Sequence, residues 1–424
     1  MNQPLSRYVD YMYSYPHKTA YRSFPAPVSL LPYLEQLQGR KASLYFHIPF
    51  CSHKCGYCNL FSLQTNRTEY IATYLDTLHR QAQQLSPLTA GLTFDSFAIG
   101  GGTPLLLTVP QLEQLMATAA LFGVHPSHAF TSVETSPEYA DRPRLNVLKK
   151  AGVSRVSIGI QSFQDEELKA IKRRPRQNTI YQALDDIRQM DFPYFNIDLI
   201  YGIKGQTVES FLYSLEEALR FQPNELFIYP LYVRQGTGIT EREPDDVCFR
   251  MYRAACKLLQ AKGFLQTSMR RFIHHPSTDA EVSCGDEVML SCGSGGRSYL
   301  GDLHYATRYT VCQQCIAREI DEYMATTDFT VARNGFILSA KEQQQRFIIK
   351  NLMYYMGIDK AEYTRRFGEP LDRTPLFRQL AEQYWIEETP ERIRLTPEGL
   401  GYSDYIGQLF ITPEIRQLME TYSY

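Results

Sequence analysis

The sequence predicts an α/β protein in which six parallel strands alternate with helices and form either an open sheet or an incomplete (β/α)6 barrel. Three observations support this fold class. Six short strand-like runs follow one another between residues 43 and 232, amphipathic stretches separate them, and Gly, Pro or Asn bounds most of the runs. Strands that are joined through helices run parallel, with right-handed crossovers. Chemically active side chains then gather where the strands end.

The predicted strands, in chain order, are 43–47, 94–99, 129–134, 155–160, 194–200 and 225–232. Between them, the stretches 69–85 and 208–220 keep one helical face apolar. Candidate site residues follow the strand ends. A cysteine-rich loop follows the first strand, a glycine run follows the second, and Glu134, Gln161 and Asp198 lie at or near the ends of later strands.

Four regions are expected. They are an N-terminal segment rich in Tyr, Pro and Arg (1–40), the barrel (41–240), a barrel extension with the substrate-pocket region (241–334) and a small, mainly helical C-terminal domain (335–424). The extension is predicted to contain a helix at 245–262, an irregular stretch near 284–301 and a helix around 311–325.

The C-terminal domain is predicted from helix-capping residues and helical periodicity. Ser339 and Glu342 are spaced as a capping box for a helix that ends at Met353. Helices at 359–367 and 376–384, a strand at 392–396 and a final helix follow, an order that also suits a winged-helix-like domain. Its few basic residues favour packing over the barrel mouth rather than DNA binding.

Charge and hydropathy exclude several classes of partner. The 424 residues carry 44 basic and 46 acidic side chains, without the basic excess that nucleic acid or anionic lipid would attract. No run of about 18 apolar residues exists that could span a membrane, and the polar, aromatic start lacks the core of a signal peptide. We therefore expect a cytoplasmic protein.

Three cysteines lie within eight residues, with the spacing C-x3-C-x2-C: Cys51, Cys55 and Cys58. A cluster of four irons needs one ligand per iron, so three thiolates leave one iron open to a substrate. A zinc site completed by His47 or His53 is the competing interpretation, because structural zinc requires a fourth ligand.

This motif, with Tyr57 before the last cysteine, resembles the cluster motif of the radical S-adenosylmethionine (SAM) superfamily. LYFHIPFC (44–51), GGGTP (100–104), ETSPE (134–138), GIQSF (159–163) and NIDLIYG (196–202) are similar, in order and spacing, to motifs of the oxygen-independent coproporphyrinogen III oxidases and their relatives, the heme chaperones and class C methylases. The resemblance covers about residues 40–235, with weaker similarity in YSYP (13–16) and LTPEGL (395–400).

The resemblance implies an incomplete (β/α)6 radical SAM barrel, a [4Fe-4S] cluster on the three cysteines, SAM bound to the open iron, and an electron donor such as flavodoxin or ferredoxin. It implies that Tyr45, Gly101 and Glu134 contact the cluster-bound SAM, and that Tyr45 and His47 are catalytic. A second SAM site would be lined by Tyr57, Gly102, Thr103, Gln161, Arg173 and Asp198. The substrate would be a small molecule such as a tetrapyrrole.

Leu60 departs from the oxidases, which carry a further cysteine at that position, and agrees with the heme-chaperone branch. The YSYP segment (13–16) and the long 245–330 region are less similar to that branch. We therefore expect an oxidase-like enzyme that abstracts hydrogen from an organic substrate, with methyl transfer or oxidative decarboxylation as the outcome. A heme-binding chaperone is the alternative. An electron-transfer or structural iron–sulfur protein is a third hypothesis, which would leave the open iron without a role.

Two further features of the sequence each allow two interpretations. Cys284, Cys292, Cys312 and Cys315 are either an auxiliary cluster or four unrelated thiols, and their wide separation favours the second interpretation. The segment 297–309 is rich in Arg, Tyr and His and is either a substrate-pocket loop, with Arg297 and His304 as its polar contacts, or a structural turn.

Overall fold

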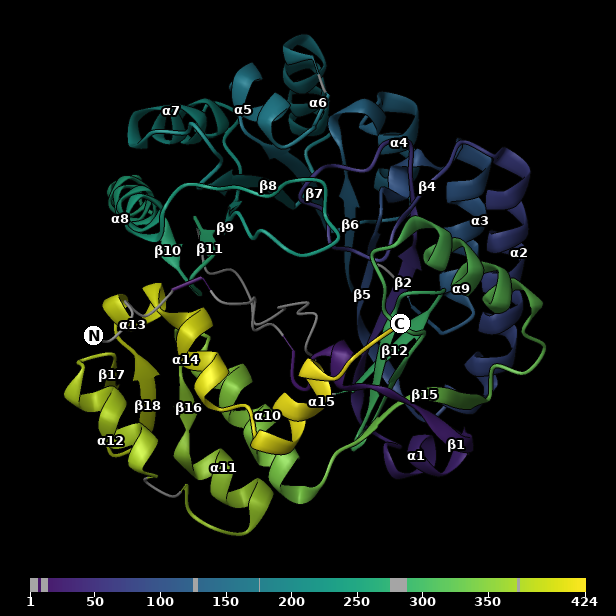
Figure 1. Ribbon diagram of the computed structural model, residues 1–424. Coiled ribbons are helices and arrows are strands. Elements are labelled where there is room, and N and C mark those ends of the chain that lie inside the picture. The colour runs from purple at the N-terminus through teal and green to yellow at the C-terminus, as the bar shows by residue number, and fades with distance from the viewer. Residues whose placement is uncertain (1–6, 9–13, 125–128, 175, 275–287, 372–373) are drawn as a thin grey trace.

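A computed structural model describes residues 7–8, 14–124, 129–174, 176–274, 288–371 and 374–424. Its centre is a parallel sheet of six strands that pair in chain order and curve into a partial barrel (Figure 1). They are β2 (Lys41–Ile48), β5 (Thr93–Gly101), β6 (Phe130–Thr135), β7 (Arg155–Gln161), β8 (Tyr194–Tyr201) and β9 (Glu225–Pro230). The six predicted strands correspond to these to within two residues at each end, so the predicted α/β fold is confirmed.

Helices cover the outer face of this sheet (Figure 1). They are α2 (Thr68–Leu85), α3 (Val109–Ala120), α4 (Arg142–Lys150), α5 (Asp165–Ala170), α6 (Gln177–Gln189), α7 (Val208–Leu219) and α8 (Asp245–Ala261). Short 3-10 turns accompany them: η1 (Lys18–Ala20), η2 (Ser86–Thr89), η3 (Pro104–Leu106) and η4 (Pro137–Tyr139). Within the described ranges, no helix combines the length and the apolar character that crossing a membrane requires.

Strand alternation explains why the two faces of the barrel differ. In β2, the outward side chains Leu44, Phe46 and Ile48 are fully buried against the helical layer, while Tyr45 and His47 face inward. The inner face carries polar side chains on neighbouring strands as well, and Ser43 and Ser96 share a hydrogen bond of 2.6 Å. The interior is therefore lined for polar ligands rather than filled by an apolar core.

The extension differs from the sequence-based expectation. The irregular stretch expected near 284–301 contains two strands, because β12 pairs in parallel with β2 and continues the sheet on that side. Beyond it the sheet is antiparallel, and its elements are β12 (Val288–Cys292), β13 (Arg297–Leu300), β14 (Leu303–Ala306), β15 (Val331–Ile337) and β1 (Arg22–Ser29), with α1 (Leu31–Gln36) and α9 (Gln313–Ala325) alongside. β12 is apolar and buried but only five residues long, and β13 and β14 have four residues each with polar side chains among them, so none carries a long apolar run.

The other end of the sheet is formed by β11 (Arg271–Ile273) and β10 (Leu265–Gln266), and the C-terminal region lies across the gap between the two ends (Figure 1). At one end, Arg270 and Asp404 form a buried ion pair of 2.6 Å. At the other, Arg22 donates to the Leu418 carbonyl at 2.5 Å. The C-terminal region therefore bridges a sheet that does not close on itself.

The C-terminal region has its own apolar core, centred on residues such as Phe347, Leu380 and Ile406. Its elements are α10 (Ala340–Leu352), β16 (Ile358–Asp359), α11 (Lys360–Phe367), α12 (Pro375–Glu382), β17 (Ile386–Glu388), β18 (Arg392–Leu395), α13 (Pro397–Gly401), α14 (Ser403–Leu409) and α15 (Pro413–Glu420). The predicted helices and strand are confirmed. Half of the predicted capping box forms: Ser339 accepts from the Glu342 amide at 3.2 Å, whereas the Glu342 carboxylate accepts from Thr412 and Tyr15 instead.

Candidate active site

The three clustered cysteines lie in a loop at the C-terminal end of β2. Cys51 ends the short strand β3 (Phe50–Cys51), which pairs with β4 (Leu63–Gln64) and closes the loop. The Thr65 amide donates to the Cys51 carbonyl at 2.9 Å and fixes the same closure. Burial raises the pKa of the Cys51 thiol to about 11, and the charges of Cys58 and Cys55 in the same loop add to that rise. The loop thus holds three thiols together at the edge where active sites of parallel sheets form.

Hydrogen-bond donors from two other segments, the end of β5 and the connection between α5 and α6, reach two of these sulfurs. Thr103 Oγ1 lies 3.6 Å from Cys51 Sγ, and Arg173 Nη1 lies 3.5 Å from Cys55 Sγ. Cys58 Sγ lies 3.9 Å from Ser62 Oγ, within the same loop. Donors of this kind stabilise thiolates and the sulfurs of a bound cluster.

The three cysteines of the loop are the kind of ligands that a four-iron cluster requires. Within the described part of the chain, no three His, Cys, Asp or Glu side chains, the loop cysteines included, form a group that could hold one metal ion. A four-iron cluster makes a different demand, because each thiolate binds a separate iron. The two histidines considered as zinc ligands make other contacts, since the Nε2 atoms of His47 and His53 donate to the carbonyls of Phe61 and Lys172.

The glycine run at the end of β5 allows polar side chains to converge. A Cβ at Gly100 would lie 2.7 Å from Glu134 Oε2 and 3.0 Å from the Tyr45 hydroxyl. Gly101 has a φ of +115°, and its Cβ would lie 2.8 Å from the His47 ring. The Gly101 amide donates to Glu134 at 3.3 Å. Tyr45, Glu134 and the glycine backbone therefore form one polar surface beside the cysteine loop.

Two carboxyl groups on the inner face have raised pKa values. The Glu134 side chain is accessible on the inner face of the barrel, but the surrounding protein desolvates it there. This desolvation and the charge of Asp198 raise the pKa of Glu134 to about 7. Burial also raises the pKa of Asp198 to about 6, opposed by a hydrogen bond of 2.8 Å from Asn196. The Arg155 guanidinium lowers both pKa values and itself pairs with Glu225 at 3.0 Å. A cationic ligand placed between these carboxyls would favour their ionised forms.

The residues assigned by resemblance to a second SAM site divide into two groups. Thr103 and Arg173 contact the cysteine sulfurs, and Arg173 also lies 3.4 Å from the Tyr57 hydroxyl and donates to the Gly159 carbonyl. Gln161 is the last residue of β7 and has a φ of 76°, and Asp198 lies within β8, three residues before its end. Positive φ in a residue other than glycine is uncommon and concentrates at functional sites.

His47 is held as a neutral imidazole. Its Nε2 donates to the Phe61 carbonyl at 2.9 Å, and its Nδ1 accepts from the Tyr45 hydroxyl at 3.2 Å. Burial lowers its pKa to about 4. Both ring nitrogens therefore bind the protein, and His47 positions Tyr45 toward the glycine run.

The segment 297–309, expected as a loop or turn, is mainly the β13–β14 hairpin, in which Tyr299 pairs with His304. The predicted substrate contacts lie in different surroundings. Arg297 is half-buried and donates to the Ser14 hydroxyl. His304 is fully buried, and neither of its ring nitrogens has a hydrogen-bond partner among the described residues.

The later cysteines do not assemble around one point in the described ranges. Cys292 is fully buried in β12, whereas Cys312 is exposed and Cys315 half-buried at the start of α9. Cys284 lies outside the described residues. The described cysteines of this group therefore lie in separate environments, which agrees with unrelated thiols.

Two residues of the cysteine loop itself were missed by the sequence analysis. Ser62 contacts Cys58, and Lys54 Nζ donates to the Val311 carbonyl at 3.1 Å, which ties the loop to the segment before α9. Their position within SHKCGYCNLFS was the available indication, but neither side chain is required by the cysteine spacing.

Comparison with known proteins agrees with this geometry. Residues 45–218 match the Radical SAM superfamily, and residues 338–401 match the HemN C-terminal domain. The oxygen-independent coproporphyrinogen III oxidase of Salmonella typhimurium is 30% identical over 420 residues, which cover 91% of this chain and 89% of that protein. The chain belongs to the radical SAM superfamily.

Within the superfamily, its relatives carry two different names. The heme chaperone HemW of Bacillus subtilis is 27% identical over 87% of this chain and 100% of its own length. The oxygen-independent coproporphyrinogen III oxidase of Escherichia coli is 26% identical over 85% of this chain and 83% of its own length. The solved structure of the Escherichia coli enzyme superposes with a TM-score of 0.82 at 23% identity, covering 94% of this chain and 96% of that one. The incomplete radical SAM barrel with a helical C-terminal region is therefore confirmed, and the superfamily implies a [4Fe-4S] cluster and SAM.

Proposed function

We propose that this protein is a radical SAM enzyme that holds its cluster on Cys51, Cys55 and Cys58 and acts on a small organic substrate, a tetrapyrrole being the class suggested by its relatives. Cys51, Cys55 and Cys58 would hold the cluster, and after reduction by a donor such as flavodoxin or ferredoxin it would supply the reductive cleavage of SAM needed for hydrogen abstraction from the substrate. Methyl transfer or oxidative decarboxylation is the outcome. The observation that carries the proposal is the grouping of the three thiols beside Tyr45, Gly101 and Glu134.

The chain's own residues would bind and orient SAM. The Gly101 backbone allows close approach, because no Cβ obstructs it. Glu134 would accept hydrogen bonds from ribose hydroxyls or from the ammonium group of SAM. Since its pKa is about 7, a cationic neighbour would shift Glu134 toward the carboxylate form. Tyr45, held by His47, would lie against the same ligand.

A second SAM would be bound by Tyr57, Gly102, Thr103, Gln161, Arg173 and Asp198, and would supply the carbon of a methyl transfer. Support comes from Gln161 and Asp198, which lie on the same inner face as Glu134 but one and two strands farther along the sheet. Asp198 influences the pKa of Glu134, so the two proposed sites would be neighbours.

Delivery of heme is the second candidate function. HemW aligns over its whole length, and Leu60 agrees with the chaperone branch. In this alternative, the cluster persists while heme is held and passed on.

An anaerobic assay separates the candidates. The chain is reconstituted with iron and sulfide, reduced, and supplied with SAM, and 5′-deoxyadenosine is measured. The enzyme hypothesis predicts product from the unmodified chain and from Cys256→Ala, a half-buried cysteine on α8, and none from Cys55→Ala. Tight heme binding with no product above the Cys55→Ala background would instead favour the chaperone.

A further inference from the structure

Two of the later cysteines, Cys312 and Cys315, lie next to each other at the start of α9, with the spacing C-x2-C. Cys312 is the N-cap of the helix, and its sulfur accepts a hydrogen bond of 3.4 Å from the Cys315 amide. The extended backbone of an N-cap directs its side chain back over the first turn of the helix. The two thiols therefore face each other at the end of one element.

The two thiols differ in exposure and in pKa. Cys312 is exposed, whereas Cys315 is half-buried. Hydrogen bonds from the thiol and the amide of Cys315 lower the pKa of Cys312, and the Arg318 guanidinium adds to this effect. The thiol–thiol hydrogen bond and desolvation raise the pKa of Cys315. Cys312 is therefore the thiol that ionises first, and it is also the one that molecules in solution reach.

The start of α9 is fixed to the cysteine loop. The Gln313 side chain donates to the Ser62 carbonyl at 2.9 Å and accepts from the Gln64 amide at 2.8 Å. The Cys312 amide donates to Thr310 Oγ1 at 3.2 Å. Because these contacts already hold the backbone, joining the two sulfurs would order little of the chain that is not ordered before.

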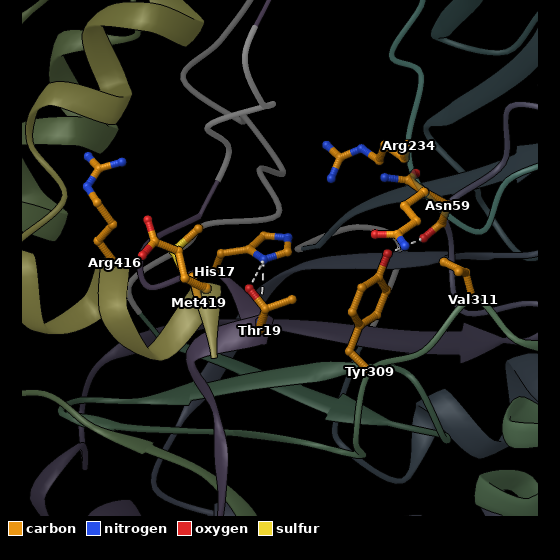
Figure 2. Close-up of a pocket in the computed structure, with 10 residues that line it drawn as sticks. His17, Thr19, Asn59, Arg234, Tyr309, Val311, Arg416 and Met419 are labelled. Atoms are coloured by element: carbon orange, nitrogen blue, oxygen red, sulfur yellow. Dashed lines mark hydrogen bonds between the residues drawn. The ribbon is translucent and has the colours of Figure 1, made fainter. Parts of the chain in front are cut away.

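The residues before Cys312 are anchored to the same loop. Tyr309 and Val311 lie in the wall of a cavity between the cysteine loop and α15 (Figure 2). The Tyr309 hydroxyl donates to the Asn59 carbonyl at 2.9 Å, and the Val311 carbonyl accepts from Lys54 at 3.1 Å. Anchors therefore stand on both sides of Cys312 in the sequence, and they hold the thiol pair beside the loop that carries the cluster cysteines.

We propose that Cys312 and Cys315 are a redox-active dithiol that exchanges with disulfides in solution, with Cys312 as the attacking thiol and Cys315 as the resolving thiol. The Cys312 thiolate attacks one sulfur of the external disulfide, forms a mixed disulfide and releases the other half as a thiolate. Cys315 then loses its proton and attacks the Cys312 sulfur, which displaces the second thiolate. The chain's two thiols are oxidised to one disulfide, and the external disulfide is reduced to two thiols that take up the two protons.

Exchange with oxidised glutathione tests the inference. The anaerobically reconstituted chain is incubated with an excess of oxidised glutathione, remaining thiols are trapped with N-ethylmaleimide, and peptides are analysed by mass spectrometry. We expect most molecules to carry a Cys312–Cys315 disulfide, which dithiothreitol reduces. Cys256 on α8 is half-buried like Cys315, and Cys256→Ser, the matched control, should form the same disulfide to the same extent.

Single substitutions test the two roles. Cys315→Ser should accumulate glutathione on Cys312, because no resolving thiol remains. Cys312→Ser should take up glutathione at Cys315 about tenfold more slowly, because that thiol is less exposed. Equal rates in the two variants would overturn the assignment of Cys312 as the attacking thiol.

The unmodified chain decides whether the pair forms a disulfide, so this result does not depend on the folding of a variant. Absence of the Cys312–Cys315 disulfide would overturn the inference, as would a mixed disulfide that persists on Cys312 or a disulfide that joins Cys312 to another cysteine. Exchange requires neither SAM nor a reduced cluster. The outcome is therefore independent of the proposed function.

Discussion

Closely spaced cysteines occur both in the loop after β2 and at the start of α9, but their surroundings differ. In the loop, donors from the ends of other segments, Thr103 and Arg173, reach the sulfurs of Cys51 and Cys55. At α9, Cys312 caps its own helix and accepts from the Cys315 amide at 3.4 Å. Sequence spacing brings thiols together in both places. Of the two places, only the loop at the C-terminal edge of the parallel sheet also has glycines, carboxyl groups and hydrogen-bond donors from other segments beside its thiols.

The largest expected difference between the two places is in iron binding. Cys55→Ala should lose essentially all reconstituted iron and the visible absorption of thiolate-bound iron, because the cluster requires each of its three thiolates. Cys312→Ala should retain both. Iron and sulfide analysis of the two variants side by side makes the comparison. A comparable loss of iron in Cys312→Ala would mean that α9 contributes a ligand, and would contradict the expected difference between the loop and α9.

A second prediction separates the two proposed SAM sites within the barrel. Glu134→Gln should reduce SAM cleavage at the cluster by about tenfold. Asp198→Asn should leave SAM cleavage unchanged and reduce formation of S-adenosylhomocysteine by about tenfold. Each substitution removes one charge-assisted hydrogen bond to the SAM molecule that the residue would bind. Both products are measured in the same reaction with candidate substrates. Parallel losses of both products in both variants would contradict a separate second site.

A smaller difference is expected in thiol reactivity. Hydrogen bonds from Cys315 lower the pKa of Cys312, which is exposed, whereas burial raises the pKa of Cys51 to about 11. In the cluster-free chain, N-ethylmaleimide should therefore modify Cys312 about tenfold or more faster than Cys51. Peptide mass spectrometry over a time course measures both rates. Faster modification of Cys51 would show that the loop opens when no cluster is bound.

The smallest expected effect is a pH-dependent change in stability. Desolvation raises the pKa of Glu134 to about 7, so the folded chain favours the protonated carboxyl group. The stabilisation from this preference is fully present below the unfolded-state pKa of Glu134 and is lost as pH rises through about 7. The melting temperature of the ligand-free chain, relative to Glu134→Gln, should fall between about pH 5 and pH 8. A constant difference across that interval would indicate that the carboxyl group is well solvated.

Much of the barrel could be predicted from sequence because its strands are buried on the outer face and bounded by turn residues. β2 and β5–β9 are of this kind. The strands β12 and β15 were missed because they pair with distant partners, as Ser291 does with Tyr45. β13 and β14 pair locally across Gly301 and Asp302, and that turn was the available indication of the hairpin. β1 contains two prolines, which are typical of an edge position and weaken the strand pattern.

The residues of the site also differ in whether the sequence could predict them. The cysteines, the glycine run and Glu134 lie at or directly after strand ends, and Asp198 lies in the second half of β8, so the motifs and their order were informative. The cavity between the cysteine loop and α15 was not predicted, because His17, Arg234 and Arg416 come together only when the C-terminal region bridges the open sheet. No local sequence pattern indicates that these three side chains share a cavity.

The most direct test of the account is electron paramagnetic resonance of the reduced, reconstituted chain with and without SAM. Three thiolates should leave one iron of the cluster able to bind SAM, so we predict a cluster signal that changes when SAM is added. An unchanged spectrum, or anaerobically purified protein that contains zinc instead of iron, would contradict the central claim.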